Sequence, residues 1–478
     1  MSSDDLWTEK KQTDKNTYIF IAASLFFLFL LFFFHYLHIP WQANAALSIL
    51  FYSLILWALE PVPFGMTSLI TLLLLLLLQA ASMDTVFSGF ASPAVFLIIA
   101  GIMIAKGVNE TRLLDRITYF LLSKSGGSPG LLFVIIFLLI QVQALFIPAA
   151  SVRITLILPI VLMVISYVNT SRQSNFNRLM LVGTAYAGNI SGMGVLTAGV
   201  ANILTVEMLA VYHGSTLNYF QWLVYAFPLW TGASVFVILF LLWFYPPEKM
   251  DLSGLQKDMK KKRLEMGKLD AAEVKCICIL LLAVALWMTE PFHGLHPVFP
   301  ALAAAVLMGL PGSGFTSWQR LVQIDFDLII LIGATLSLGF ALIESGAVEI
   351  VTEIVTTDWV VQLASSTWVM VLMVIVLTQF YHLIVTNINT AVVTMVPFLI
   401  SFSHQLGHDP IMIVFISSVS TLFGFVLVVQ TIPNVLVYNT GLIRAREFIA
   451  PGIGASIITM VLTGLVAFTY WRGVQFWP

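Results

Sequence analysis

The sequence predicts an all-α polytopic membrane protein made of two inverted repeats. The first observation behind this prediction is composition. Of the 478 residues, 59% are hydrophobic and 10% are charged, which is more apolar surface than a soluble protein of this size can bury. The second is a series of apolar stretches long enough to cross a bilayer. The third is a pair of polar islands inside two such stretches, at corresponding places in the two halves of the chain.

The first half holds apolar stretches separated by polar or charged residues. They cover residues 17–38, 42–59, 61–81, 93–122, 130–168, 179–211 and 220–245. The fifth stretch is broken in its middle by Pro148 and the polar island that follows it. The sixth is interrupted by the glycine-rich run from Gly188 to Gly194. Proline and glycine inside an apolar stretch favour a broken helix.

A charged linker at 246–270 separates the halves, and we expect it to be a solvated loop. Its lysine and arginine residues place it on the cytoplasmic side by the positive-inside rule. The apolar stretches after it cover residues 271–289, 296–310, 326–356, 367–402, 410–440 and 448–472. The fourth of these is expected to break at Thr386–Thr390, and the fifth near Thr431-Ile432-Pro433-Asn434.

The two halves repeat in sequence at a nearly constant offset. The segment LWALEP recurs as LWMTEP 230 positions later, and Asn202 recurs as Asn434 after 232 positions. The prolines that follow the two polar islands, Pro159 and Pro397, lie 238 positions apart. Ordered matches at nearly one offset indicate duplicated units.

The repeat predicts a topology if 130–168 and 367–402 each fold back as a re-entrant hairpin. Each repeat then crosses the membrane five times, and an odd number of crossings inverts the second repeat. With the stretch 17–38 outside the repeat, we expect eleven transmembrane helices and two hairpins, which is the architecture of an inverted-repeat secondary transporter. The N-terminus is then cytoplasmic and the C-terminus outside, in a multi-pass protein of the plasma (inner) membrane.

The two polar islands are the first candidate site, because polar residues at membrane depth are costly. At each hairpin tip, helix N-termini can point backbone amides at one spot and attract an anion. Ser151, Asn387, Asn389 and Thr390 can add directed hydrogen bonds. The alternative is that these side chains only join helices or satisfy the broken backbone.

Two ionisable residues lie in or beside the islands. Arg153 needs an anionic partner or a watery cavity, and three uses compete. It can bind a substrate carboxylate as a fork, replace a bound cation, or form a structural pair with a buried carboxylate such as Glu207. His382 is expected to be packed, and it is the best candidate for a pH-sensitive group.

The glycine-rich breaks form the second pair of candidates. One runs from Ser191 to Asn202 and the other from Gly424 to Asn434. Glycine permits close backbone approach, and unwound carbonyl groups can coordinate Na⁺. No cofactor is expected, and a Na⁺ coupling ion is compatible with the pattern.

Several segments, taken together and in order, resemble the divalent anion–sodium symporter (DASS) family. They are ILWALEPVPFGMTSLITLLLLLLLQ, SPAVFLIIAGIMIAKG, TAYAGNISGMGVLTAGVAN, FQWLVYAFPLW and TIPNVLVYNTG. The resemblance implies a homodimer in which a transport domain moves past a scaffold by an elevator-type displacement. Residues 1–125 and 271–360 would form the scaffold, 126–245 and 361–478 the transport domain, and 246–270 the linker.

The resemblance also implies roles for individual residues. Substrate would be bound by Ser151, Arg153, Asn202, Asn387, Asn389, Thr390, Pro433 and Asn434. Sodium would be bound by Thr386, Asn387, Asn389, Gly424 and Thr431. The family's hairpin motif Ser-Asn-Thr appears here as Ala149-Ala150-Ser151 and Asn387-Ile388-Asn389, so the first sodium site has lost a hydroxyl and an amide.

These departures favour exchange of dicarboxylates over Na⁺ symport. Arg153 falls where sodium-independent exchangers of the family carry a basic residue. The expected substrates are succinate, malate, fumarate, 2-oxoglutarate or citrate. The alternatives are a Na⁺-coupled dicarboxylate symporter and a transporter of an inorganic oxyanion such as sulfate. Expected partners are the anion, membrane lipid and a second copy, with no nucleic acid.

Two function classes other than carriers are disfavoured. A channel needs a continuous polar stripe, which the apolar stretches lack. An enzyme needs a nucleophile or a metal cluster, and the sequence has no nucleophile elbow and no zinc spacing. The absence of a Walker A loop also disfavours an ATP-driven pump.

Overall fold

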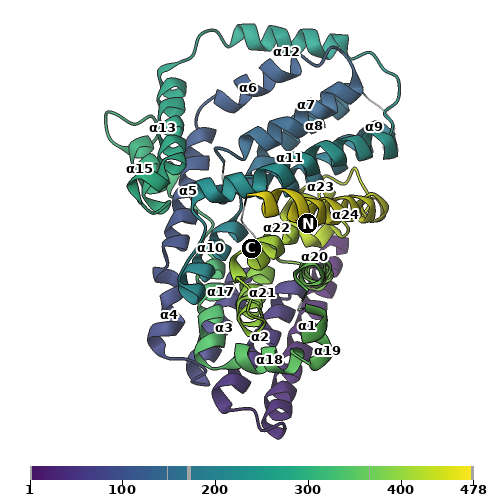
Figure 1. Cartoon of the computed structure of the whole chain (residues 1–478). Helices are drawn as coiled ribbons and strands as arrows, with labels where there is room; N and C mark the ends of the chain where they lie inside the picture. Colours follow the sequence, from purple (N-terminus) through teal and green to yellow (C-terminus); the bar gives the residue numbers. More distant parts are fainter. Residues whose placement is uncertain (1–2, 148, 169–173, 365, 475–478) are drawn as a thin grey trace.

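The computed structural model describes residues 3–147, 149–168, 174–364 and 366–474, with side chains from Lys15 onward. Within these residues every regular element is a helix (Figure 1), which confirms the all-α prediction. Nine of these helices are long and apolar enough to cross a membrane, as a multi-pass protein requires. The number of eleven spans stays a prediction, because further apolar helices in the described part are shorter than 18 residues.

The helices of the first half follow the predicted stretches. They are α1 (Ser3–Tyr36), α2 (Trp41–Leu59), α3 (Phe64–Leu77), α4 (Met83–Ala91), α5 (Pro93–Asn109), α6 (Leu113–Leu122), α7 (Pro129–Gln143), α8 (Ala150–Val168), α9 (Asn175–Ser191), η1 (Leu196–Ala198), α10 (Val200–His213) and α11 (Tyr219–Phe244). α7 ends at Gln143 and α8 begins at Ala150, so Ser151 and Arg153 of the first polar island lie in the first turn of α8. The glycine-rich run begins in the last turn of α9, which ends at Ser191. Pro148 itself lies outside the described residues.

The second half repeats this order. Its helices are α12 (Ser253–Glu265), α13 (Ala271–Met288), α14 (Glu290–His293), α15 (Val298–Gly309), α16 (Trp318–Leu321), α17 (Phe326–Glu344), α18 (Ala347–Val355), α19 (Asp358–Ala364), α20 (Thr367–Ile384), α21 (Ile388–Gln405), α22 (Pro410–Thr421), η2 (Val428–Gln430), α23 (Ile432–Tyr438), α24 (Arg446–Val466) and η3 (Ala467–Trp471). The second island separates α20 from α21.

Two predicted apolar stretches each divide into two helices. Residues 93–122 divide into α5 and the amphipathic α6, and residues 326–356 divide into α17 and the amphipathic α18. The second division falls at Gly346, whose φ of 73° is left-handed and ends the helix at low cost. Each amphipathic helix buries one apolar face.

The linker at 246–270 is not the solvated loop that its charges suggested. It contains α12, which buries Leu255 and Met259 and packs against α6. Lys262 and Arg263 lie over the rings of Tyr119 and Phe120, at 5.7 and 4.7 Å from the ring centroids. Two buried apolar residues and two cation–π contacts offset the polar character of this segment.

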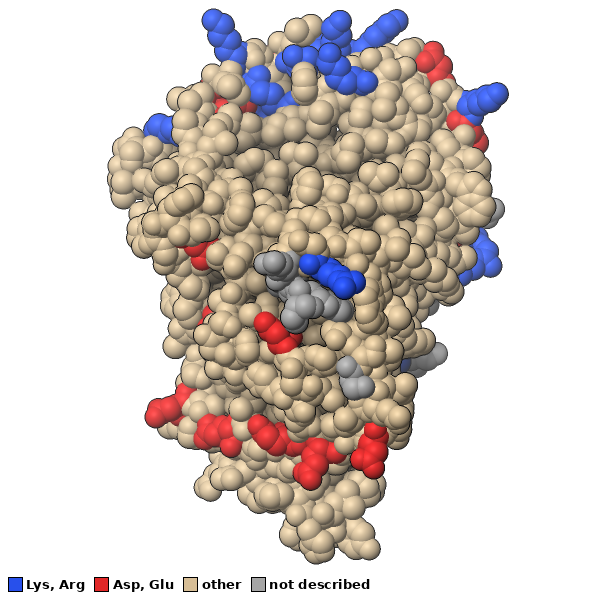
Figure 2. Space-filling view, in the orientation of Figure 1, with Lys and Arg blue, Asp and Glu red and all other residues tan. Residues whose placement is uncertain are grey.

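Charge separates the two ends of the molecule. Lys and Arg side chains gather at the end that carries α6 and α12, and a band of Asp and Glu crosses the face near the opposite end (Figures 1 and 2). Exposed lysines of the linker are Lys249, Lys257, Lys260, Lys261, Lys262 and Lys268, and exposed acids of α4 and α17–α19 are Asp84, Asp327, Glu344, Glu349, Glu353 and Asp358. Between them lies the mainly apolar girdle expected of a membrane protein.

The helices pack around two apolar cores. A smaller core joins α1–α4 to α17 and α18, and a larger one holds the helices on both sides of each break. The smaller core draws only on residues assigned above to the scaffold. The division into scaffold and transport domain stays a prediction.

A buried ion pair fixes the end of the linker. Arg116 of α6 donates from Nε and Nη2 to the carboxylate of Glu273 at 3.1 and 3.0 Å, and from Nη1 to the carbonyl of Gly267 at 2.7 Å. Glu273 is fully buried. Removal of Glu273 leaves the Arg116 guanidinium, whose side chain is 19% exposed, without its compensating charge.

We expect Glu273→Ala to lower the free energy of unfolding by about 3 kcal/mol, because it strands the Arg116 guanidinium. Unfolding of the purified protein in detergent measures the change. The control is Glu265→Ala, which breaks the exposed pair with Lys261 (3.9 Å) and should cost less than about 0.5 kcal/mol. Equal losses in the two variants would contradict the structural role of the buried pair.

Candidate functional site

Two helices break at equivalent places in the repeats. After α9, extended residues lead through η1 to Gly199, which has φ −142° and ψ 138° at the start of α10. After α22, the chain passes through η2 to Thr431, with φ −143° and ψ 147° at the start of α23. The turns η1 and η2 begin 232 residues apart, the same offset as in the sequence. The repeat is therefore present in backbone conformation as well as in letters.

Each break is bridged by one asparagine in the first turn of the following helix. Asn202 Nδ2 donates to the carbonyl oxygens of Gly192 and Val195, at 2.7 and 3.1 Å. Its repeat partner, Asn434, donates to those of Gly424 and Leu427, at 2.8 and 2.9 Å. The accepting residues are also 232 positions apart, so the same side chain satisfies the same carbonyl groups in both halves.

Asn189 connects the two breaks. It lies at the end of α9, in the first half, and its Nδ2 donates to Gly424 O at 3.0 Å and to Asn434 Oδ1 at 3.1 Å. The side chain is buried, and its Oδ1 has no partner among the described residues. The sequence placed Asn189 inside a break but gave it no role. What could have pointed to Asn189 in the sequence is its amide side chain, which lies in a glycine-rich segment that has a counterpart in the second repeat.

Arg153 is fully buried and reaches across the first break. Its Nε donates to Ser191 Oγ at 3.1 Å, and its Nη1 donates to the carbonyl oxygens of Ile147 at 2.6 Å and Ala198 at 2.9 Å. Its Nη2 has no partner among the described residues. A guanidinium has five N–H bonds, two of them on Nη2. These two N–H bonds of Arg153 are free to donate to an acceptor.

The structural pair of Arg153 with Glu207 does not form. The recorded hydrogen bonds of Arg153 go to one hydroxyl and two carbonyl groups, and Glu207 lines a separate cavity of about 450 Å³ between α4, α10 and α17. The other two uses of the guanidinium stay open.

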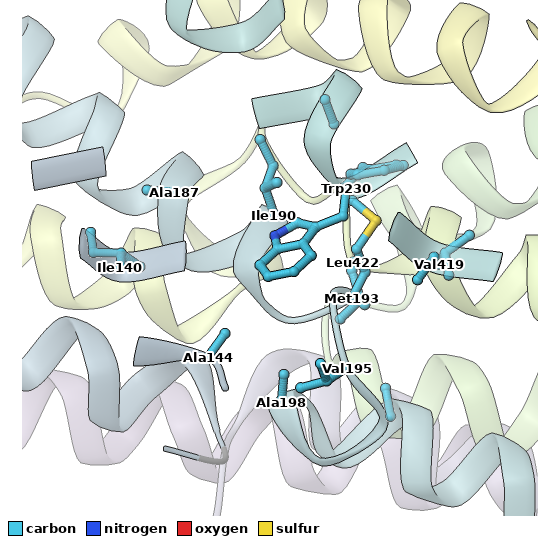
Figure 3. Close-up of a cluster of buried hydrophobic side chains, with 14 of the residues drawn as sticks. Ile140, Ala144, Ala187, Ile190, Met193, Val195, Ala198, Trp230, Val419 and Leu422 are labelled. Atoms are coloured by element: carbon cyan, nitrogen blue, oxygen red, sulfur yellow. The ribbon is translucent and has the colours of Figure 1, made fainter. Parts of the chain in front are cut away.

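An apolar cluster holds the first break from the other side. Figure 3 shows the Trp230 indole among apolar side chains that include Ala187, Ile190 and Leu422. Trp230 Nε1 donates to Gln141 Oε1 at 2.8 Å, and Gln141 Nε2 donates to Ala187 O at 3.0 Å. A Cβ atom on Gly194 would lie 2.5 Å from the indole, so only glycine fits there.

The second hairpin tip uses its polar residues mainly as a helix cap. Asn387 precedes α21, and its Oδ1 accepts from the backbone amides of Asn389 and Thr390 at 3.0 and 3.1 Å. Thr390 is buried, and its hydroxyl has no partner among the described residues. Asn389 and Thr386 are partly exposed. The Asn387 oxygen therefore caps the first turn of α21, and the binding role expected of this residue stays a prediction.

His382 lies beside the second break and is fully buried, as the sequence predicted. Its Nδ1 lies 3.0 Å from Val385 O, and a Cβ atom on Gly424 would lie 2.8 Å from its Nε2. Val385 and Ile147 are related by the 238-residue offset of the hairpins, so equivalent tip carbonyls contact His382 and Arg153.

The predicted break from Gly424 to Asn434 agrees with the structure as far as Thr431 and extends three residues too far. The irregular segment is 422–431, and residues 432–434 form the first turn of α23, with Thr431 Oγ1 accepting from the amide of Asn434 at 3.3 Å. Proline is well suited to a first helical turn, where its missing N–H removes no hydrogen bond. The motif therefore starts a helix.

The structure brings most of the predicted residues to the two breaks. Pro433 lies near Gly188 and Ile154, so the first hairpin contacts the break of the other half. Ser151 is partly exposed. The convergence of the two hairpin tips on one anion stays a prediction. In the described part of the chain no group of three or more His, Cys, Asp or Glu side chains can hold a metal ion.

Comparison with known proteins then decides the family. A family model described as the sodium:sulfate symporter transmembrane region matches residues 14–477. The chain belongs to the sodium:sulfate symporter family. This result confirms the divalent anion–sodium symporter resemblance found in the sequence, and it makes the protein a transporter and not an enzyme.

Relatives of this symporter-family chain include two named transporters. It is 24% identical over 444 residues to the sodium-dependent dicarboxylate transporter SdcS of Staphylococcus saprophyticus, covering 86% of this chain and 83% of that protein. It is 23% identical over 483 residues to SdcS of a bovine Staphylococcus aureus strain, covering 94% and 90%. The crystal structure of the Alcanivorax borkumensis YdaH transporter is similar in fold, with a TM-score of 0.52 at 15% identity, over 83% of this chain and 88% of that one.

We expect Asn202→Ala to lower the free energy of unfolding by about 2 kcal/mol, because it leaves the buried Gly192 carbonyl without its donor and removes one of the two donors to Val195 O. Unfolding in detergent measures the change. Asn44→Ala is the matched control, since that buried amide donates to one carbonyl, Leu31 O, and accepts from the Ser48 hydroxyl, and the change should cost about 1 kcal/mol. A loss no larger than that of the control would mean that other donors satisfy the break.

Proposed function

We propose that this chain is a secondary active transporter of small divalent organic anions, working by exchange. Arg153 carries the proposal. It is a buried guanidinium beside a helix break at membrane depth, with no carboxylate partner recorded and with Nη2 unpaired among the described residues. An anionic group is the partner that such a side chain requires.

The guanidinium has the surroundings of a bound cation. Its Nη1 donates to two carbonyl oxygens that no other recorded donor pairs with, one from the hairpin tip and one from the break. Carbonyl oxygens of unwound helices are the ligands that Na⁺ uses in transporters with broken helices. The position of Nη1 among these oxygens supports the use of Arg153 as a replacement for a bound cation. The unpaired Nη2 supports its use in binding a substrate carboxylate.

Electrostatics then favours exchange. A dianion that crosses the membrane without compensation works against about 2.3 kcal/mol per charge per 100 mV. Arg153 lowers that cost while substrate is bound. Without substrate, the same guanidinium is an unpaired charge in a medium of low dielectric constant, so the empty carrier crosses reluctantly. A carrier of this kind moves mainly when loaded in both directions.

The second half bears on the alternative, Na⁺-coupled dicarboxylate symport. The SdcS relatives are named sodium-dependent, which supports Na⁺ as a coupling ion. Three of the five residues assigned to sodium already have their oxygens engaged in hydrogen bonds, however. Gly424 O accepts two hydrogen bonds, Asn387 Oδ1 accepts two, and Thr431 Oγ1 caps α23. Binding of Na⁺ would have to displace these donors, which favours exchange as the first proposal. Sulfate transport is retained as the second alternative on the family description alone.

The setting of this function is proposed with it. The basic end with α6 and α12 is assigned to the cytoplasm by the positive-inside rule, with the N-terminus cytoplasmic and the C-terminus outside. The carrier would act as a homodimer in the plasma (inner) membrane, surrounded by lipid, with a transport domain that moves past a scaffold in an elevator-type step.

Reconstituted proteoliposomes test the exchange. We expect labelled succinate or malate to enter only when unlabelled dicarboxylate is inside, and a Na⁺ gradient alone to drive less than about a tenth of that uptake, because the empty carrier crosses slowly. Excess external sulfate should not compete. Strong Na⁺-driven uptake into empty vesicles would overturn exchange, and competition by sulfate would favour the oxyanion alternative.

Substitution of Arg153 separates its two uses. We expect Arg153→Ala to abolish the thermal stabilisation of purified protein by dicarboxylates, because the fork that holds the carboxylate is lost. Raised Na⁺ should not restore it. Arg153→Lys keeps the charge without the planar fork and should retain weakened binding.

The outcomes for Arg153 are distinct. Unchanged affinity in Arg153→Ala rules out contact with the carboxylate, and full rescue by Na⁺ would mean that the guanidinium only replaces a cation. Arg446→Ala, at an exposed arginine on α24, is the control for nonspecific loss of charge and should bind normally.

A further inference from the structure

Two glutamines at the end of α7 differ in a way that their burial does not explain. Gln141 and Gln143 are 6% and 4% exposed, respectively. Both amide atoms of Gln141 have hydrogen-bond partners, since Nε2 donates to Ala187 O and Oε1 accepts from Trp230 Nε1. Gln143 has no partner for either amide atom, Nε2 or Oε1, among the described residues. It is the only glutamine side chain in that part of the chain with both atoms buried and unpaired.

Burial of an unpaired amide is costly. A buried polar group without a hydrogen bond destabilises a protein, and native structures keep few of them without a functional reason. An apolar residue would fill the same place at less cost. Gln143 is therefore best explained by a group that pairs with it when the protein works.

The place of Gln143 points to the substrate. Its carbonyl accepts from the amide of Ile147 at 2.8 Å, and Ile147 O in turn accepts from Arg153 Nη1. One residue of the first hairpin tip, Ile147, thus joins the backbone of Gln143 to the guanidinium. Both residues also carry unpaired buried nitrogen atoms, Nε2 and Nη2.

In the second repeat, the residues equivalent to Gln141 and Gln143 both have hydrogen-bond partners. At the hairpin offset of 238 residues, Gln141 corresponds to Gln379 and Gln143 to Tyr381. Gln379 donates to Ser420 O, and the Tyr381 hydroxyl pairs with that of Thr394. Both equivalents are satisfied within the protein, so the unpaired amide is particular to the half that carries Arg153.

We propose that Gln143 contacts the transported anion and recognises a hydroxyl group beside its carboxylate. This rests on the function proposed above. A carboxylate only accepts hydrogen bonds, so it can pair with Nε2 and leaves Oε1 unpaired. A hydroxyl both donates and accepts, so it satisfies both atoms of the amide. The preferred substrate class is then the 2-hydroxydicarboxylates, with unsubstituted dicarboxylates as weaker substrates.

The test compares malate with succinate, which differ by one hydroxyl. In reconstituted protein we expect Gln143→Leu to weaken malate uptake, measured as KM, by about tenfold, and succinate uptake by less than threefold, because a site that pairs with a hydroxyl discriminates against its loss. The thermal stability of substrate-free protein should be unchanged or higher, since a buried unpaired amide is removed.

Gln141→Leu is the matched control on the same helix. It strands Trp230 Nε1 and Ala187 O, so it should lower thermal stability and leave the ratio of malate to succinate KM as in the wild type. Gln143→Met, which is unbranched and of similar volume, replaces Gln143→Leu if that variant folds poorly.

Each other outcome overturns the inference. Equal loss of malate and succinate uptake means that Gln143 does not read the hydroxyl. Unchanged KM values for both, in variants that fold, mean that water or a protein group pairs with the amide. Failure of the wild type to transport either anion refutes the proposed function itself, which is a different result from wild-type transport that Gln143→Leu leaves unaltered.

Discussion

The structure depends on one constraint: inside a bilayer no water pairs with backbone groups that a helix leaves free. Two helices break at membrane depth, and the carbonyl groups at each break need donors from the protein. Asn202 and Asn434 supply them at equivalent places, and Asn189 ties one break to the other. The polar side chains of the candidate site are therefore required by the broken backbone before any substrate is considered.

Arg153 meets the same requirement and adds charge. Its Nη1 satisfies two carbonyl groups, as an amide would, but the side chain also brings a positive charge held by neutral oxygens. Neutral donors at that place would leave charge balance to mobile ions. One residue type thus links the solvation of a helix break to the energetics of moving an anion, and the link exists only in the first half.

The sequence predicted the helices and their breaks well, because apolar length, proline and glycine are local signals. The repeat offset also identified Asn202 and Asn434 as equivalent positions in the two halves. The sequence could not predict the hydrogen-bond partners of these side chains. Arg153 bonds to Ser191 and Ala198, tens of residues away, and Asn189 bonds to the other half of the chain. The helix α12 was missed because its stability comes from packing on α6, which charge composition does not reveal.

Matching breaks have a consequence for direction. In the proposed carrier, two segments with the same bridging amide and nearly the same dihedral angles would give two end conformations built from equivalent parts. Such end conformations are expected to be close in free energy, so that neither membrane face is intrinsically preferred. The direction of transport is then set by the concentrations on either side, and transport is reversible. The asymmetry between the two halves lies in their side chains, above all in the charge of Arg153.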